Sequence, residues 1–138
     1  MYDHVLIPTD GTETSARAVE HGVGLAAELG ATVHALSVIE GAGAVQRDQI
    51  RADPEEESRE AVEAVEAAAD DAGVPVATAL REGTSADEIL EHIVEQQADL
   101  VVMGTDERAG LDRVFDNSVA EEVLENTTVP VLTVTNPA

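Results

Sequence analysis

Five short apolar segments alternate with four amphipathic segments along the chain, and this alternation is the feature that most constrains the fold. The apolar segments have the length of strands, whereas the segments between them repeat their apolar residues at helical spacing. A β-α-β-α-β-α-β-α-β order indicates an α/β fold, with a doubly wound parallel sheet covered by helices on both faces. The third apolar segment opens with a proline, which is typical of an edge strand. The expected strands are residues 4–10, 32–40, 75–83, 98–104 and 129–134.

The expected helices carry start and stop signals. Thr12 and Gly30 are suited to cap the first helix, and Asp53 is suited to cap the second. Ser85 followed by Glu88 predicts a capping box at the start of the third helix, where Ile89 and Ile93 should then face inward. The fourth helix is expected in the segment SVAEEVLEN.

The length and the residue types limit the class of protein. We expect a single domain, 1–138, because 138 residues can enclose one sizeable core. The absence of cysteine excludes disulfides and thiolate sites. No apolar run reaches the roughly 18 residues of a membrane span, and the first residues lack the cationic start of a signal peptide. These features predict a cytoplasmic protein.

The charge balance predicts the partners that the protein avoids and the salt in which it works. Twenty-nine acidic residues oppose seven basic ones, all arginine, and the formal net charge is -22. Such a chain repels nucleic acid and anionic membranes, so we expect neither as a partner. Repulsion among the carboxylates weakens the folded state unless salt screens it, and at 1 M salt the Debye length is only ~3 Å. We therefore expect a salt-rich cytoplasm, as in a halophile.

Several functions of α/β proteins lack their characteristic residues in this chain. A P-loop NTPase and a two-component receiver domain both require a lysine, and the chain has none. The four histidines show no ligand spacing, so structural or surface roles are expected for His4, His21, His34 and His92. No general base or phosphate-binding lysine can be identified for a nucleotide-hydrolysing enzyme. The sequence therefore gives no indication of an enzyme.

Three segments resemble the universal stress protein family. They are VLIPTDGTETSARAV near the start, EGTSADEIL in the middle and GTDERAGLDRVFDNSVAEEVLENTTVPVLTV near the end, and the resemblance runs from residue 3 to residue 134. It implies a Rossmann-like sheet of the adenine-nucleotide alpha-hydrolase-like type, with strand order 3-2-1-4-5. It also implies a homodimer formed largely through the final strand. In the nucleotide-binding branch of the family, a G-x2-G-x9-G-S/T motif cradles the phosphates.

This chain keeps the motif only in part. Gly104 matches the first glycine and Ser118 the final hydroxyl residue, whereas Glu107 and Asn117 replace the second and third glycines. The resemblance further implies that Asp10 contacts the ribose, although capping the loop before the first helix is an equally good role for it. The remaining positions that the resemblance places around a nucleotide are Pro8, Thr9, Val38, Met103, Arg108 and Val119.

Glu107 is the more damaging of the two glycine replacements, because asparagine tolerates left-handed backbone better than most residues. A carboxylate ~5 Å from a phosphate charge, at an effective dielectric constant of ~20, costs on the order of 3 kcal/mol. That cost corresponds to roughly two decades of affinity. A magnesium ion that bridges Glu107 to a phosphate would turn the carboxylate into a ligand. Arg108 would either pair with Glu107 or reach a phosphate.

Two functions therefore stay open. The first is a homodimeric stress-response protein with weak or lost nucleotide binding, which acts through its dimer surface or through unknown protein partners. The second is a Mg-dependent regulatory protein that binds ATP or AMP. In both, a terminal edge strand this apolar needs covering, so we expect the dimer to form through Val129, Val131, Leu132 and Val134.

Overall fold

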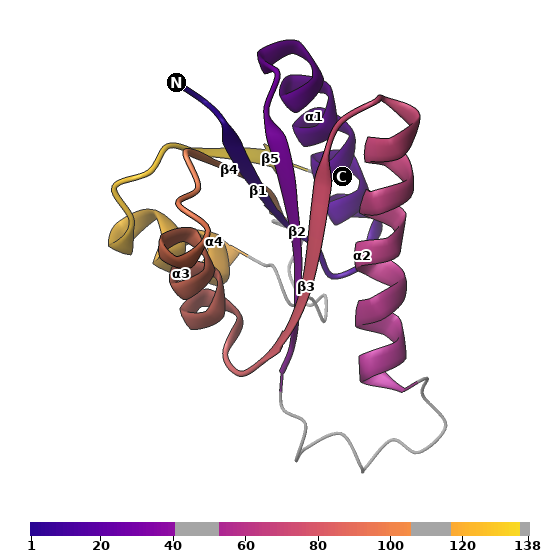
Figure 1. Ribbon diagram of the computed structural model, residues 1–138. Helices are drawn as coiled ribbons and strands as arrows, with labels where there is room; N and C mark the ends of the chain where they lie inside the picture. Colours follow the sequence, from indigo (N-terminus) through magenta and orange to yellow (C-terminus); the bar gives the residue numbers. More distant parts are fainter. Residues whose placement is uncertain (41–52, 106–116, 136–138) are drawn as a thin grey trace.

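A five-stranded parallel sheet, in the order β3-β2-β1-β4-β5, is the centre of the computed structural model, which describes residues 1–40, 53–105 and 117–135 (Figure 1). The parallel sheet and its predicted order 3-2-1-4-5 are confirmed. The first and last residues of the strands lie within two positions of the predicted ones. Their bounds are β1 His4–Pro8, β2 Thr32–Ile39, β3 Val76–Glu82, β4 Leu100–Thr105 and β5 Val131–Thr135.

Helices cover both faces of this sheet, two on each side (Figure 1). On one face lie α1 (Glu13–Leu29) and α2 (Pro54–Asp71), and on the other lie α3 (Ser85–Glu95) and α4 (Asn117–Asn126). One helix connects each strand to the next, as parallel pairing requires. The strand order reverses at the centre of the sheet, where β1 pairs with both β2 and β4.

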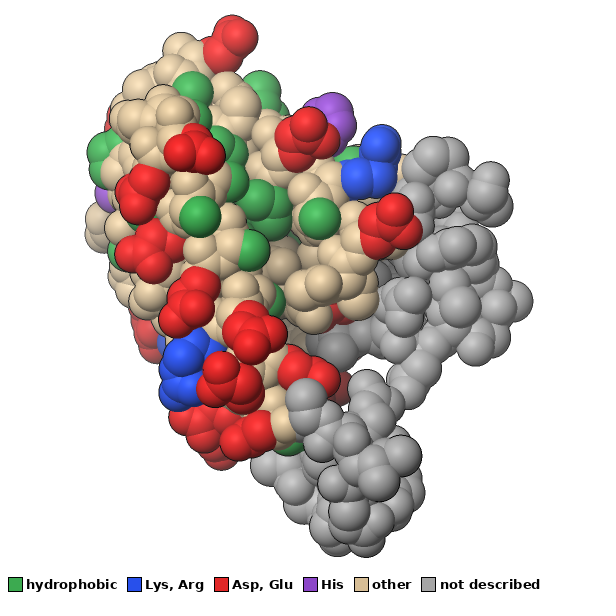
Figure 2. Space-filling model, turned by 90° about the vertical axis from the view of Figure 1, so that its right-hand side faces the viewer, with side chains coloured by type: hydrophobic (Ala, Val, Ile, Leu, Met, Phe, Trp, Pro, Cys, Tyr) green, Lys and Arg blue, Asp and Glu red, His purple; other side chains and the backbone are tan. Residues whose placement is uncertain are grey.

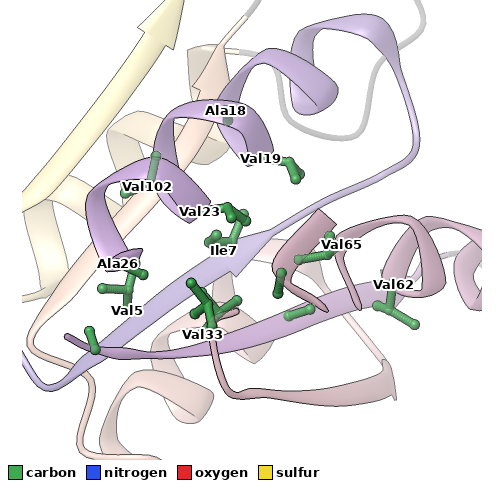
Figure 3. Packing of buried hydrophobic residues seen from close by; sticks show 14 of the residues in the cluster. Val5, Ile7, Ala18, Val19, Val23, Ala26, Val33, Val62, Val65 and Val102 are labelled. Carbon is green, nitrogen blue, oxygen red and sulfur yellow. The ribbon is translucent and has the colours of Figure 1, made fainter. Parts of the chain in front are cut away.

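The core beneath α1 and α2 is built from small aliphatic residues. Val5 and Ile7 of β1 are fully buried and pack with Val23 of α1 and Val65 of α2 (Figure 3). A Cβ atom added to Gly22 of α1 would lie 2.6 Å from Cδ1 of Ile7, so the glycine leaves room for the Ile7 side chain in its present position. Among the described residues, close packing thus fills a core in which no aromatic side chain of Phe, Tyr or Trp takes part.

The core beneath α3 and α4 explains why the central strands are mainly apolar along their length. Leu6 of β1, Leu36 of β2 and Met103 of β4 are fully buried on this face, while neighbouring residues of the same strands are buried on the other. Strands buried on both faces are mostly apolar, and His34 and Ser37 are buried polar residues within β2. The predicted inward positions of Ile89 and Ile93 on α3 are confirmed, since they are 0% and 4% exposed.

The helix caps follow the sequence signals, with one exception. Thr12 accepts a hydrogen bond from the Ser15 N–H at 3.3 Å, Gly30 ends α1 in the left-handed region, and Asp53 accepts one from Glu55 N–H at 3.0 Å. The predicted capping box is wrong, because α3 already begins at Ser85. Thr84 takes the capping position, and within the described residues its side chain makes no cap hydrogen bond. Glu88 pairs with Arg81 instead, at 2.6 Å.

β5 forms one edge of the sheet, and its apolar side chains divide between core and surface. Val129 and Val131 pack partly against the core beneath α3 and α4. Val134 is only 8% exposed and packs in the core beneath α1 and α2, so its side chain contributes to the core of this chain, and the predicted dimer through β5 stays a prediction. Leu132 is 40% exposed and is the apolar side chain of β5 that is most open to a partner.

Carboxylates dominate the surface of the described residues. Figure 2 shows acidic side chains spread over the face turned to the viewer, with few cationic ones among them. The first turn of α2 alone carries Glu55, Glu56 and Glu57, all exposed. This turn is stabilised by the helix dipole and by ion pairs from Arg59 to Glu55 and Glu56. In residues 1–40, 53–105 and 117–135, no helix has both the length and the apolar character needed to cross a bilayer.

Candidate functional site

The carboxyl ends of β1, β2 and β4 meet at the centre of the sheet, and several predicted site residues come together there. Pro8 and Met103 are fully buried, Val38 is 5% exposed and Thr9 is 2% exposed. The Thr9 N–H donates to the Leu36 carbonyl at 2.8 Å, so the chain stays attached to β2 beyond the end of β1. Doubly wound sheets bind ligands at this edge, where the strand order reverses. This edge is therefore the candidate functional site.

The Asp10 carboxylate organises the loop between β1 and α1. Its Oδ1 accepts hydrogen bonds from the Thr12 N–H at 3.0 Å, the Thr12 hydroxyl at 2.6 Å and the Ser15 hydroxyl at 2.7 Å. The Asp10 N–H in turn donates to the Ser15 Oγ at 3.3 Å. A carboxylate at the start of α1 is also favoured by the helix dipole. Of its two expected roles, the loop-capping one is present in the fold.

Glycine is required in the same loop for a backbone reason. Gly11 has φ of +81°, in the left-handed region that residues with a Cβ adopt at a cost. Its N–H donates to the Thr9 Oγ1 at 3.2 Å. The path of the chain from β1 into α1 is thus fixed by Gly11, by the buried Thr9 and by Asp10.

Gly104, which matches the first glycine of the nucleotide motif, lies against the backbone of α1. A Cβ atom at this position would lie 2.7 Å from the Thr14 carbonyl oxygen, 2.8 Å from Thr14 Cγ2 and 3.0 Å from the Thr14 carbonyl carbon. Contacts below 3.0 Å with backbone cannot be relieved by rotating a side chain. Packing of β4 against α1 therefore requires glycine here, whether or not a phosphate binds.

The start of α4 contributes the last part of the predicted site. The helix begins at Asn117, so the exposed Ser118 and the half-buried Val119 lie in its first turn. The N–H groups of a first helical turn are suited to an anion. Glu107 and Arg108 lie outside the described residues, so the part of the predicted site that would face the phosphates stays a prediction.

One contact beside this site has no signal in the sequence. Glu40, just after β2, accepts a hydrogen bond through Oε2 from the Ser85 N–H at 2.5 Å, across 45 positions of sequence. The Gly83 N–H donates to the Ile39 carbonyl at 3.2 Å and closes the same edge. The start of α3 is thereby tied to the end of β2, two residues beyond Val38. Only the adjacency of β2 and β3 in the sheet brings these residues together.

Metal ligation by several side chains is not found in the described part of the chain. Among residues 1–40, 53–105 and 117–135, no three His, Asp or Glu side chains are grouped so that they could hold a metal ion. The N–H groups of Asp10, Gly11 and Thr12 in the loop after β1 already donate to side chains of the same loop or of the first turn of α1.

The parallel sheet order, the helices on both faces and the site at the central strand ends define a Rossmann-like α/β protein. The chain belongs to the universal stress protein family, since the model of that family matches residues 1–135. Among its relatives, the universal stress protein MJ0531 of Methanocaldococcus jannaschii is 37% identical over 147 residues, covering 99% of this chain and 84% of that protein. The family resemblance noted in the sequence is thus confirmed.

Solved structures agree with this assignment. The structure of hypothetical protein MJ0577, whose biochemical function was assigned from its structure, superposes with a TM-score of 0.81 at 25% identity and covers 100% of this chain and 99% of that one. The universal stress protein from Archaeoglobus fulgidus in complex with dAMP gives a TM-score of 0.74 and covers 96% of this chain and 98% of that one. At 19% identity this second likeness shows the shared fold alone.

Proposed function

We propose that this universal stress protein is a homodimeric regulatory protein of the stress response whose nucleotide binding is weak or lost. It would act in the cytoplasm through its dimer surface or through protein partners. The observation that carries this proposal is that Asp10, at the ribose-contacting position of the family, and Gly104, at the first glycine of the motif, both have tasks in the fold. Their presence is therefore explained without a bound nucleotide.

The replaced glycines support the same conclusion. Glu107 stands where the second glycine of the motif would allow a phosphate to approach, and it brings a negative charge to that position of the sequence. At ~5 Å and an effective dielectric constant of ~20, such a charge costs on the order of 3 kcal/mol against a phosphate charge. Asn117 at the third position adds a Cβ where the motif has none. Together they favour weak binding.

Calorimetric titration tests the proposal. Protein dialysed free of nucleotide is titrated with ATP and with AMP in molar KCl, once with Mg²⁺ and once with EDTA. We expect no micromolar binding in either condition. Micromolar binding without Mg²⁺ would contradict the proposal, and micromolar binding only with Mg²⁺ would establish the second function.

The second function is a Mg-dependent regulatory protein that binds ATP or AMP. It is favoured by the first turn of α4, which lies at the sequence position of the S/T end of the motif, and by the dAMP complex of a protein with the same fold. In this alternative Mg²⁺ bridges Glu107 to the phosphates and Arg108 reaches a phosphate. The ion would convert the repulsion into coordination.

The dimer interface gives a separate prediction. β5 is an edge strand with Leu132 40% exposed, and an apolar edge of this kind needs covering. We expect the protein to sediment as a dimer in molar KCl and Leu132→Glu to sediment as a monomer, because two carboxylates would then face one another across the pairing. Leu29→Glu, at a 45% exposed leucine on the last turn of α1, is the matched control and should stay dimeric. A wild-type monomer would refute pairing through β5.

The net charge of -22 supports a salt-rich cytoplasm and predicts how stability depends on salt. We expect the thermal unfolding midpoint to fall as KCl is lowered from molar to millimolar concentration. Carboxylate repulsion acts over a Debye length that grows from ~3 Å at 1 M to ~30 Å at 0.01 M. Circular dichroism at a series of KCl concentrations measures the effect. A midpoint that stays constant over this range would argue against adaptation to high salt.

A further inference from the structure

Three histidines that the candidate site does not use lie on the side of the sheet that carries α3. His34 of β2 is 8% exposed and His92 of α3 is 5% exposed. His34 Nε2 lies 3.0 Å from Nδ1 of His4, which opens β1, and the two ring centroids are 5.1 Å apart. One of these two nitrogens must therefore carry the hydrogen and the other the lone pair.

Arg81 of the edge strand β3 fixes the state of His92. The Arg81 Nη1 lies 3.4 Å from the His92 Nδ1. Because a guanidinium can only donate, the His92 Nδ1 must offer its lone pair, and the ring in this arrangement is neutral. Arg81 is also bonded to Glu88 and Glu95, each at 2.6 Å, and to Glu91. One arginine thus holds β3 to three carboxylates of α3 and to a neutral His92.

We propose that His34 and His92 form an acid-responsive joint that holds α3 to β2 and β3 when both rings are neutral and loosens α3 when they take up protons. Protonated His92 would place a second cation against the Arg81 guanidinium and would lose the acceptor that Arg81 uses. Protonated His34 would place a charge among buried apolar residues and next to His4. Burial is costly for a charge that lacks its own partner.

Most of the surroundings of the joint lower the pKa values of its two histidines. Burial, then the neighbouring His4 and His92, lower the pKa of His34. Burial, then Arg81, lower the pKa of His92, while Glu95, whose Oε1 is 3.9 Å from Nδ1, opposes the shift. From the β4 side, Asp99 accepts the backbone N–H groups of Asp3 and His4. The carboxylates of the neighbouring α4 are exposed, namely Glu121, Glu122 and Glu125.

The sign and size of the effect follow from proton linkage. Both rings have folded-state pKa values below the ordinary one, so a locally opened state in which they meet water binds more protons than the closed state. The opened state therefore gains as pH falls below about 6.5. One pH unit below that value, the opening constant rises by at most about tenfold for one ring and at most about a hundredfold for both. The Ser85 end of α3 carries the contact with Glu40, so the loosening would reach the edge of the candidate site.

Amide hydrogen exchange of the full chain tests the joint. The protein is measured in molar KCl at pH 7.5 and pH 5.5, and rates are corrected for intrinsic exchange. We expect the opening constants of α3 to rise by up to about a hundredfold, while α1, which packs on the other face, changes little. His92→Gln keeps an acceptor for Arg81 and should reduce the step to at most about tenfold, the limit for one ring. His21→Gln, at an exposed histidine of α1, should keep the full step.

Three results would overturn the proposal. They are an α3 protection that does not depend on pH, an equal loss of protection in α1 and α3, and a full pH step in His92→Gln. If His92→Gln does not fold, titration of the imidazole nitrogens of the wild-type protein by NMR decides. Titration of His34 and His92 below pH 6.5 is expected, and titration at or above it would overturn the joint.

Discussion

Replacing Gly104 by alanine is expected to lower the free energy of unfolding by about 3 kcal/mol, the upper end of the usual cost of overpacking. The added Cβ would lie 2.7 Å from the Thr14 carbonyl oxygen and 3.0 Å from its carbon, both backbone atoms of α1. The helix would therefore have to move away from β4, which would disturb the buried contacts around Ile7 and Val102. Denaturant unfolding in molar KCl, without nucleotide, measures the loss.

Gly24→Ala is the matched control for this prediction. Gly24 lies in α1, and in the described part of the chain no atom beyond its chain neighbours and the backbone of its own helix comes within 4 Å of the position of its Cβ. Alanine in a helix interior is favoured over glycine by about 1 kcal/mol, so this variant should gain stability. If Gly104→Ala were as stable as the wild type, α1 would tolerate the methyl group. The glycine at 104 would then need another explanation, such as the approach of a ligand.

The Gly104 contact also bears on how the nucleotide motif is interpreted. Glycine at a position can be required by packing within the fold or only by the approach of a ligand. Gly104 belongs to the first kind, and positions 107 and 117 carry Glu and Asn in place of the other two motif glycines. Packing against α1 thus explains the presence of Gly104 whether the proposed loss of nucleotide binding holds or not.

Local signals in the sequence were enough to predict most of the fold. The caps at Thr12, Gly30 and Asp53 depend on residues within a few positions of one another, and the structure confirms them. Strand β3 begins after Pro75 at an edge of the sheet, as its proline predicts. β5 begins at Val131 rather than at position 129, and the Pro130 carbonyl accepts the Val101 N–H at 3.0 Å just before it. The order of the strands, by contrast, came from the family resemblance.

Contacts between distant segments could not be predicted in the same way. Glu40 and Ser85 are 45 positions apart, and Arg81 meets carboxylates 7 to 14 positions further on in a helix that the sequence alone does not orient. His4 and His34 are 30 positions apart and meet because β1 and β2 pair, with His34 one pleat beyond Thr32, the partner of His4. Distant contacts also explain why the predicted capping box is wrong. Glu88 forms an ion pair with Arg81, and the Ser85 N–H donates to Glu40.

Replacing Glu107 by glycine is expected to change nucleotide affinity by about a hundredfold, and the direction of the change separates the two proposed functions. If Glu107 repels the phosphates, its removal returns on the order of 3 kcal/mol per charge pair, so ATP and AMP should bind more tightly with or without Mg²⁺. If Glu107 ligates a bridging Mg²⁺, its removal takes away a ligand, and binding in the presence of Mg²⁺ should weaken. Calorimetric titration of the variant and the wild-type protein in molar KCl measures both.

Glu107→Gln separates the charge of this residue from its size. The amide has nearly the shape of the carboxylate without its charge, so it should return most of the affinity if repulsion is the cause. If the side chain instead blocks the approach of the phosphates, glutamine should bind as poorly as the wild type and only glycine should restore affinity. No gain in either variant would mean that Asn117 alone is enough to prevent binding. Asn117→Gly in the Glu107→Gly background would then be expected to recover the affinity, because it completes the three glycines of the motif.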